Sequence, residues 1–560
     1  MNTSKVMFIF FVIIISLCVV KTQPVKSQDI GIIYIASDGS ISSTTNDTIP
    51  IQQDGNVYTF TDNIDGNSIV VQCDNIVIDG AGYSLSGGGA LVGIDLSYRK
   101  NVTIKNMQLG LFFYAIYLAN ASGNTITENA LTYNSNGVYL IDASQNAIIR
   151  NNMTNNEIDI NIISSSTNIF RDNSLNNSQN LAIYGTEPSH FDNDIDESNT
   201  VNGKKIYYLT SESNLVISPS TFPNLGYLAL IYCNNITVND LELTNNGQGV
   251  VLAFTTESTI TQNNLTDNYV GISLFSSSDN SIVDNHIINN YRGIQLSSSN
   301  GNTLSGNNMT DNMSGIFLFD SLLNGIIGNN ITNNGIGIGF EESSNNVIRN
   351  NFFINNTEPV YDAHMDNSSI LISMNLWNFS YPLGGNYWSS YTGVDEKSGA
   401  NQDQPGTDGI GDTPYVIYEN NIDNFPLLPY TRPPAIIIIS PENKTYPVTS
   451  ISFAFTVSEP TSWTAYSIDG QASVEITEDK TLEGLTVGSH SLTIYVKYEN
   501  GFENSATVYF TVGQGAESLS FPIAWVVVII VMVVIVVTLL IYFKKKKHYS
   551  SVNISKAVYS

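Results

Sequence analysis

Apolar and polar residues alternate in short segments that recur along the chain at a fixed interval. The pattern Gly-[Ile/Val]-x-[Leu/Phe], with other residues tolerated at the first position, begins at Gly93, Ala115, Gly137 and Asp159, and again at Gly249, Gly271, Gly293, Gly315 and Gly337. Every step within each run is 22 residues. Strand residues point alternately to two faces, so each segment is predicted to be a short β-strand with one buried face. A period of this length is typical of stacked repeats.

Asparagine forms a second column with nearly the same period. Its predicted members are Asn129, Asn151, Asn173, Asn239, Asn263, Asn285, Asn307, Asn329 and Asn350. Stacked coils place like residues above one another, so we expect these side chains to form a structural ladder of amide hydrogen bonds inside a turn. The repeats lack helical spacing and are separated by Ser- and Asn-rich turn formers. The sequence therefore predicts an all-β, right-handed parallel β-helix solenoid with coils of about 22 residues.

Composition shifts along the chain predict seven segments. These are a signal peptide (1–27), an N-terminal cap region (28–68), the β-helix (69–375, interrupted at 183–233), a C-terminal cap with an acidic loop (376–430), an immunoglobulin-like β-sandwich (435–513), a transmembrane helix (522–543) and a cytoplasmic tail (544–560). The sandwich is inferred from alternating strands within about 80 residues, without a disulfide.

Both ends of the chain carry membrane signals. Residues 6–20 are apolar and are flanked by Lys5 and Lys21, as in a signal-peptide core, with an uncleaved anchor as the alternative. Residues 522–543 are nearly all apolar, long enough to span a bilayer, and four lysines follow at once. The positive-inside rule places that tail in the cytoplasm. We therefore expect a single-pass protein of the cell membrane with an extracellular N-terminal ectodomain.

Charge narrows the range of partners. Only 13% of residues are charged, and the net charge is −28. A nucleic-acid partner would need a basic surface, so we expect none. Cys73 and Cys233 stand in similar sequence contexts on coils far apart, which favours small buried thiols over a disulfide.

An acidic segment near the end of the predicted rod is a candidate calcium site. It packs five acids into 18 residues, together with glycines that allow a tight loop. Calcium takes six to eight oxygen ligands from loops of this kind. The candidate ligands are Asp395, Asp403, Asp408 and Asp412. The alternative is a solvated acidic turn that caps the rod.

Four further motifs carry a family resemblance. They are residues 201–209 (VNGKKIYYL), 232–238 (YCNNITV), 385–388 (GNYW) and 408–415 (DGIGDTPY). Together with the repeats, they resemble archaeal cell-surface proteins with NosD-like β-helix domains, over roughly residues 50–430. The resemblance implies a β-helix of the kind that binds or hydrolyses sugars. The wider family also includes a factor for copper-site maturation.

Three functions follow as alternatives. The architecture of rod, spacer and anchor favours a non-catalytic protein that binds glycans, a surface-layer component or other cells. A polysaccharide lyase, epimerase or hydrolase is the second reading, but the acids and arginines are scattered. Copper maturation is the third. Copper favours His, Met and Cys ligands, whereas His190, His286 and His364 are isolated, so copper is disfavoured.

Glycosylation sequons are abundant in the chain. Several arise from the Asn-Asn repeat itself and are better explained by folding. Asn46, Asn367 and Asn443 lie in predicted loops and are the candidates for modification.

Overall fold

The computed structural model describes residues 31–45, 48–428, 436–457, 461–476, 480–498 and 503–513. The chain divides into two compact units, Met1–Tyr430 and Thr431–Ser560. The predicted signal peptide (1–27), transmembrane helix (522–543) and tail (544–560) lie outside the described residues. Within the described ranges, no helix is both long enough and apolar enough to cross a membrane.

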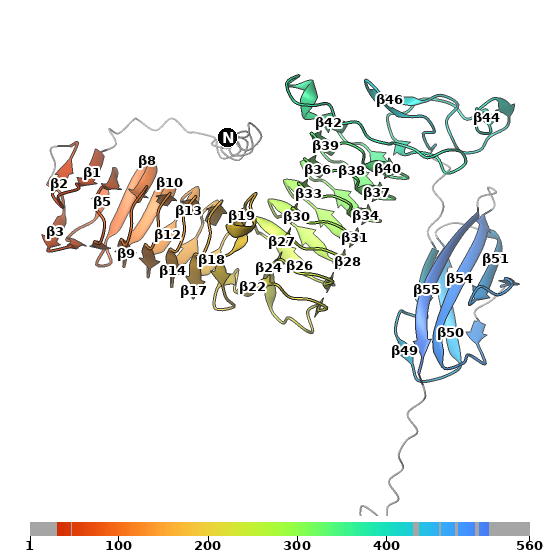
Figure 1. Cartoon of the computed structure of the whole chain (residues 1–560), viewed down its shortest axis with the longest axis horizontal. Helices are drawn as coiled ribbons and strands as arrows, with labels where there is room; N and C mark the ends of the chain where they lie inside the picture. The colour runs from red at the N-terminus through yellow and green to blue at the C-terminus, as the bar shows by residue number, and fades with distance from the viewer. Residues whose placement is uncertain are drawn as a thin grey trace, which may run out of the picture. The chain divides into compact units, whose positions relative to one another are not determined.

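Most coils of the first unit consist of three strands, and the coil formed by β28 (Thr259–Thr261), β29 (Asn264–Thr266) and β30 (Val270–Phe275) is representative. Its inward side chains, such as Ile260 and Leu265, are fully buried. About 14 such turns stack in parallel, and Figure 1 shows their strands side by side. The predicted parallel β-helix with coils of about 22 residues is confirmed.

The recurring glycine has a steric cause. A Cβ atom added at Gly271 would lie 2.6 Å from the carbonyl oxygen of Gly293 in the next coil. The coils therefore approach too closely at Gly271 for a side chain. The same column holds Ala115 and Asp159 in the first stack, and both residues are fully buried.

The long strands share one face, which we call the long-strand face. They are β1 (Gly31–Ile35), β6 (Asn67–Val71), β8 (Ser84–Asp95), β10 (Gln108–Ala119), β13 (Asn136–Ile141), β16 (Ile158–Ile163), β19 (Gln179–Tyr184), β22 (Lys204–Thr210), β24 (Leu225–Ile231), β27 (Gln248–Ala253), β30, β33 (Arg292–Ser297), β36 (Ser314–Phe319), β39 (Ile336–Glu341) and β42 (Glu358–Asp362). Shorter strands of the same sheet are β2 (Ile41–Ser43), β5 (Ile64–Asp65), β12 (Ala130–Thr132), β15 (Asn152–Thr154), β18 (Ser174–Asn176) and β21 (Thr200–Val201).

Three further sheets complete the coils. One contains β3 (Ile51–Asp54), β4 (Val57–Phe60), β7 (Val77–Asp79), β9 (Thr103–Lys105), β11 (Thr125–Thr127), β14 (Ala147–Ile149), β17 (Ile169–Arg171) and β20 (Asp194–Ile195). Another contains β23 (Val216–Ile217), β25 (Thr237–Asn239), β28, β31 (Ser281–Val283), β34 (Thr303–Ser305), β37 (Gly325–Ile327) and β40 (Val347–Arg349). The last contains β26 (Glu242–Thr244), β29, β32 (His286–Ile288), β35 (Asn308–Thr310), β38 (Asn330–Thr332), β41 (Phe352–Ile354) and β43 (Tyr387–Trp388).

The solenoid is built as two stacks that meet at residues 183–233. The first stack ends at β19, and the second continues from β22 through β42. The chain between them forms the 3-10 helix η1 (Pro188–Phe191) and an antiparallel pairing of β21 with β22. Gln248 joins the two stacks, because its side chain accepts from the backbone N of Ile183 (3.1 Å) and donates to the Ile183 carbonyl oxygen (3.0 Å). Figure 1 shows β19 next to β27 at this junction, which we call the bend.

A ladder of buried asparagines runs through the turns of both stacks. Each side chain donates to the next asparagine of the column and to a backbone carbonyl in the preceding coil. Asn307 Nδ2, for example, donates to Asn329 Oδ1 (3.0 Å) and to the carbonyl oxygen of Ile282 (2.8 Å). The ladder contains Asn129, Asn151, Asn173 and Asn199 in the first stack and Asn263, Asn285, Asn307, Asn329, Asn351 and Asn386 in the second.

Two predicted members of this ladder do not belong to it. In the coil of Asn239 the ladder position is Leu241, whose backbone N donates to Asn263 Oδ1, while Asn239 donates to the neighbouring Asp240 carboxylate. At the other end, Asn351 occupies the ladder, and Asn350 points outward with a φ of 55°. In both coils the predicted asparagine stands one or two residues before the ladder position, and only the coil register decides which residue occupies it.

Two more asparagine ladders follow other turns. One includes Asn280, Asn302, Asn324 and Asn346, and the other includes Asn268, Asn290, Asn312 and Asn334. Their members are also separated by 22 residues. The signal for them was therefore present in the sequence.

The C-terminal cap continues these ladders beyond the last coil. Asn375, Asn386, Asn421 and Asp423 accept hydrogen bonds from ladder positions of the layer before them. Trp388 stacks on Phe353 of the last coil at 4.3 Å, and its Nε1 donates to Asp423. The remaining elements of the cap region are η2 (Ala363–Met365), β44 (Lys397–Ser398), β45 (Gln404–Pro405), β46 (Tyr415–Tyr418) and β47 (Asn421–Asp423). The cap thus covers the open end of the core and repeats the hydrogen-bonding pattern of a further coil.

The second unit contains two sheets that share one core. Its strands are β48 (Ile436–Ser440), β49 (Thr445–Tyr446), β50 (Ile451–Val457), β51 (Thr461–Ile468), β52 (Val474–Glu475), β53 (Lys480–Leu482), β54 (Gly488–Tyr498) and β55 (Glu503–Val512). Buried residues such as Phe453, Ile494 and Phe510 come from both sheets. The finer assignment to an immunoglobulin-like sandwich stays a prediction.

Candidate functional site

Three tyrosines form a compact aromatic surface on the outer side of the long-strand face, and we call Tyr114, Tyr117 and Tyr139 the tyrosine face. Tyr117 in β10 pairs in register with Tyr139 in β13. Their neighbours Ile116 and Val138 are fully buried in the core, so strand alternation turns Tyr117 and Tyr139 outward. The 22-residue period places these two rings next to each other in adjacent coils.

The three rings contact one another closely. Tyr117 and Tyr139 are stacked at 5.6 Å with an interplanar angle of 17°. Tyr114 lies 4.6 Å from Tyr139 and 5.1 Å from Tyr117, measured between ring centroids. Tyr139 is buried, and Tyr114 and Tyr117 are half-buried. Burial raises the pKa of Tyr114 to about 12, so its hydroxyl remains a neutral hydrogen-bonding group. The face offers apolar rings with hydroxyls at their edges.

The long-strand face of the second stack approaches this region at the bend. Tyr184, at the end of β19, packs edge-on against Phe275 of β30, with centroids 6.3 Å apart. Tyr184 also lies close enough to Arg292 in β33 for the guanidinium to oppose the rise that burial causes in its pKa. Burial raises the pKa of Tyr139, and Tyr184 adds to that rise. Residues of both stacks therefore meet at the bend.

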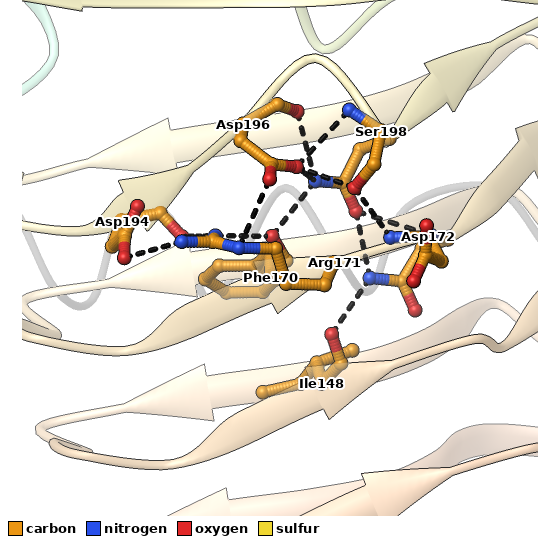
Figure 2. Close-up of polar contacts among 9 residues, drawn as sticks. Ile148, Phe170, Arg171, Asp172, Asp194, Asp196 and Ser198 are labelled. Atoms are coloured by element: carbon orange, nitrogen blue, oxygen red, sulfur yellow. Dashed lines mark hydrogen bonds and ion pairs between the residues drawn. The ribbon is translucent and has the colours of Figure 1, made fainter. Parts of the chain in front are cut away.

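The scattered arginines of the first stack are held in structural ion pairs. Figure 2 shows Arg171 between Asp194 and Asp196, with Nε of Arg171 3.0 Å from Asp196 Oδ2. Its Nη1 donates to the carbonyl oxygens of Phe170 and Asp194. Arg150 likewise pairs with Glu128 at 2.9 Å. These contacts connect successive coils. They occupy the guanidinium and carboxylate groups that would otherwise be available to a ligand.

The predicted metal ligands are spread over the cap loop as acceptors for backbone N–H groups. Asp395 accepts from the backbone N of Asp408 and of Gly409. Asp408 accepts from Gly399 and Ile410, and Asp412 accepts from Glu396 and Lys397. Asp403 is exposed and accepts from the side chain of Gln404. Over the whole described part of the chain, no three His, Cys, Asp or Glu side chains are grouped so that they could hold a metal ion.

The described histidines and cysteines lie apart from one another. Nδ1 of His190 accepts from two backbone N–H groups, and Nδ1 of His364 lies 2.6 Å from the carbonyl oxygen of Ile370. His286 is exposed on β32. Cys233 is a buried free thiol, as predicted, whereas Cys73 is only half-buried. Copper prefers clustered nitrogen and sulfur ligands, and the described residues do not fit it.

The candidate glycosylation sites fall in different surroundings. Asn46 lies outside the described residues. Asn367 is exposed and follows η2, and its side chain accepts from Ser369. Asn443 is exposed in the second unit.

The architecture places the chain among parallel β-helix proteins. A crystal structure of the periplasmic alginate epimerase AlgG matches 58% of this chain and 78% of its own, with 14% identity and a TM-score of 0.23. The tailspike protein of E. coli bacteriophage HK620, in complex with a pentasaccharide, matches 80% of this chain and 74% of its own, with 11% identity and a TM-score of 0.23. These are similarities of fold.

The sequence family is more specific. The family described as periplasmic copper-binding protein (NosD) matches residues 15–207 and 191–393, which together make up more than half of the chain. The chain belongs to the NosD family. No curated protein matches it in sequence.

Proposed function

We propose that this NosD-family chain is a non-catalytic cell-surface protein that binds polysaccharide through the tyrosine face. The proposal includes the architecture expected from the sequence: a cleaved leader, an extracellular β-helix, an immunoglobulin-like spacer and a single-pass anchor with a cytoplasmic tail, as in archaeal surface proteins. A glycan or surface-layer component is the proposed partner.

The observation that carries the proposal is the ring geometry of Tyr114, Tyr117 and Tyr139. Two half-buried rings supported by a buried third are rigid, so little conformational entropy is lost when a ligand packs on them. Sugar rings have apolar C–H faces and hydroxyl edges, which match aromatic faces flanked by polar groups. Asn136 lies in register with Tyr114, and Asn161 lies in register with Tyr139, so amide groups flank the rings. The stacked rings come from two adjacent coils, and such a surface suits contact with a short stretch of a sugar chain.

Binding of fluorescently labelled polysaccharides tests the function and the location together. Intact cells that produce the protein are expected to retain at least one neutral or weakly charged polysaccharide, and the purified protein should bind the same one. Replacing both Tyr114 and Tyr117 with alanine should weaken binding about tenfold or more, because the stacking surface is lost.

Tyr133 provides the matched control, because its ring is 64% exposed on a neighbouring turn outside the tyrosine face. Tyr133→Ala should bind like the wild type. Equal losses in both variants would contradict a specific role for the face. New reducing ends or unsaturated products in the bound polysaccharide would favour the enzymatic alternative.

Calcium binding in the cap loop is a separate prediction, motivated by the acids at Asp395, Asp403, Asp408 and Asp412. Millimolar calcium is expected to raise the melting temperature of the protein, since hard cations stabilise acidic oxygen-lined loops. Asp408→Ala combined with Asp412→Ala should abolish that rise, which differential scanning fluorimetry would measure. An unchanged melting temperature in the wild type would leave these carboxylates with only their hydrogen bonds to the backbone.

A further inference from the structure

A pocket lies on the long-strand face of the second stack, at some distance along the chain from the tyrosine face. Its volume is about 140 Å³. Strands β33, β36, β39 and β42 form its floor and sides, and residues 363–370 cover one edge. Its apolar wall includes Phe317, Phe319 and Ile370, and its polar groups include Arg292, Gln295 and Glu341. The pocket is thus concave, mostly apolar and supplied with a few convergent polar groups, as small-ligand sites are.

The guanidinium of Arg292 is held in a fixed orientation. Nη1 of Arg292 donates to Gln295 Oε1 at 2.8 Å, and Gln295 Nε2 donates to Ser297 Oγ at 3.1 Å. The guanidinium carbon lies 4.3 Å from the centre of the Phe317 ring, which is a favourable cation–π distance. Arg292 is only 9% exposed. Such a planar group, fixed by its neighbours, can present N–H donors in one direction.

Carboxyl groups lie on the other side of the pocket. Burial raises the pKa of Glu341, as does the neighbouring Glu342, while the positive charge of Arg292 opposes the rise. Asp366 accepts a hydrogen bond from the hydroxyl of Tyr361 at 2.9 Å. Both carboxyl groups line the pocket. The cavity therefore combines hydrogen-bond donors and acceptors, with charges of both signs.

The covering segment is anchored to the rod by Asp362, which is fully buried. One of its carboxylate oxygens accepts from the backbone N of His364, and the other accepts from the backbone N of Ser373 and the hydroxyl of Tyr418. His364 further contacts the carbonyl oxygen of Ile370. These bonds hold η2 against β42, so the pocket is a built feature of the fold.

We propose that this pocket binds a single neutral sugar residue at the end of a glycan chain. The inference rests on the proposed polysaccharide-binding function and deepens it by naming the class of terminal unit. Hydroxyl groups both donate and accept, so they can satisfy Arg292 and Glu341 at once. The Phe317 and Phe319 rings provide an apolar wall for the C–H face of the sugar. The small volume admits one ring at a time.

The two carboxyl groups of the pocket disfavour an acidic sugar. A uronic acid would bring its carboxylate next to Glu341 and Asp366, and like charges in a partly buried site repel. A neutral pyranose avoids this repulsion.

Calorimetric titration of the purified full-length protein tests the proposal. The probes are the methyl α- and β-glycosides of glucose, galactose and mannose, together with those of glucuronic and galacturonic acid. At least one neutral glycoside is expected to bind, and the matching uronic acid glycoside should bind about tenfold more weakly or worse. Glu341→Gln and Phe319→Ala should each weaken binding of the neutral glycoside about fivefold or more.

Glu342 offers a matched control for the carboxyl group. Glu342→Gln makes the same change at the adjacent residue, which does not line the pocket, and binding should be unchanged. Circular dichroism melting of each variant shows that it is folded. If one variant fails to fold, the other still tests the site.

Three binding results would overturn the proposal. They are a preference for the uronic acid glycosides, equal effects of Glu341→Gln and Glu342→Gln, or binding by none of the neutral glycosides. Failure of the proposed function gives different results. In that case the protein does not bind polysaccharide, or the tyrosine-face variants bind it as well as the wild type does. Cleavage of a glycoside that depends on Glu341 would also overturn the proposal for the pocket, because the pocket would then be a catalytic site.

Discussion

Replacing Asn307 with leucine is expected to lower the free energy of unfolding by roughly 2–6 kcal/mol. Oδ1 of Asn307 accepts from the backbone N and the side-chain Nδ2 of Asn285, each at 3.0 Å. Its Nδ2 donates to the carbonyl oxygen of Ile282 and to Asn329 Oδ1. Leucine would leave a backbone N–H and a backbone carbonyl buried without these partners, at about 1–3 kcal/mol for each.

Hydrogen exchange can locate this loss as well as measure it. In a stacked repeat each coil contacts only its neighbours, so faster exchange should be concentrated in β32, β35 and β38. Asn308→Leu is the matched control, because Asn308 faces outward and its side chain bonds only to the side chains of Thr310 and Asn330. That variant should change stability by about 0.5 kcal/mol or less. Equal melting temperatures for the two variants would show that the ladder does not support the coil.

The second large effect concerns Asp159, which ends one asparagine ladder at the last coils of the first stack. Its Oδ1 accepts from Nδ2 of Asn156 at 2.8 Å and from the side chain of Asn177. Burial raises its pKa to about 7, although these hydrogen bonds favour the charged form. In the unfolded chain the carboxyl has an ordinary value near 3.8.

This shift makes the folded state less stable at higher pH. Between about pH 4 and pH 7 the folded state holds the proton of Asp159 more tightly than the unfolded state does. Stability from this group is therefore fully present below the unfolded pKa and is lost as the pH rises through the folded pKa. A shift of about three units corresponds to about 4 kcal/mol.

Asp159→Asn is accordingly expected to raise the free energy of unfolding at pH 8 by about 2–4 kcal/mol and to change it little at pH 4. An asparagine oxygen can accept the same two hydrogen bonds without carrying charge. Urea unfolding at several pH values measures the effect. Asp142→Asn, on an exposed turn, is the control and should follow the wild-type profile. Parallel profiles for wild type and Asp159→Asn would contradict the buried-carboxyl explanation.

The fold could be predicted from the sequence because a solenoid is specified by neighbouring coils. A period of 22 residues places Ile272 directly beneath Ile294 and Leu274 beneath Leu296. The alternation of apolar and polar residues indicates which face of each strand is buried. The same reasoning found most of the asparagine ladder. It failed at Asn239 and Asn350, because the ladder position lies two residues later in the first case, at Leu241, and one residue later in the second, at Asn351. The local pattern carries no information about this register.

The candidate site depended on tertiary structure instead. The tyrosine face lies within the repeat, but nothing in the alternation distinguishes its rings from other outward residues until their stacking is seen. The bend joins Ile183 to Gln248, 65 residues apart. The pocket around Arg292 likewise needs a cover from residues 363–370, and no periodic signal records such contacts. The sequence by itself therefore determined the coil, its core and its polar ladders, because these repeat between adjacent coils. Only the tertiary structure decided where the stacks bend and which side chains enclose a ligand-sized space, because those contacts occur once and join residues far apart in the chain.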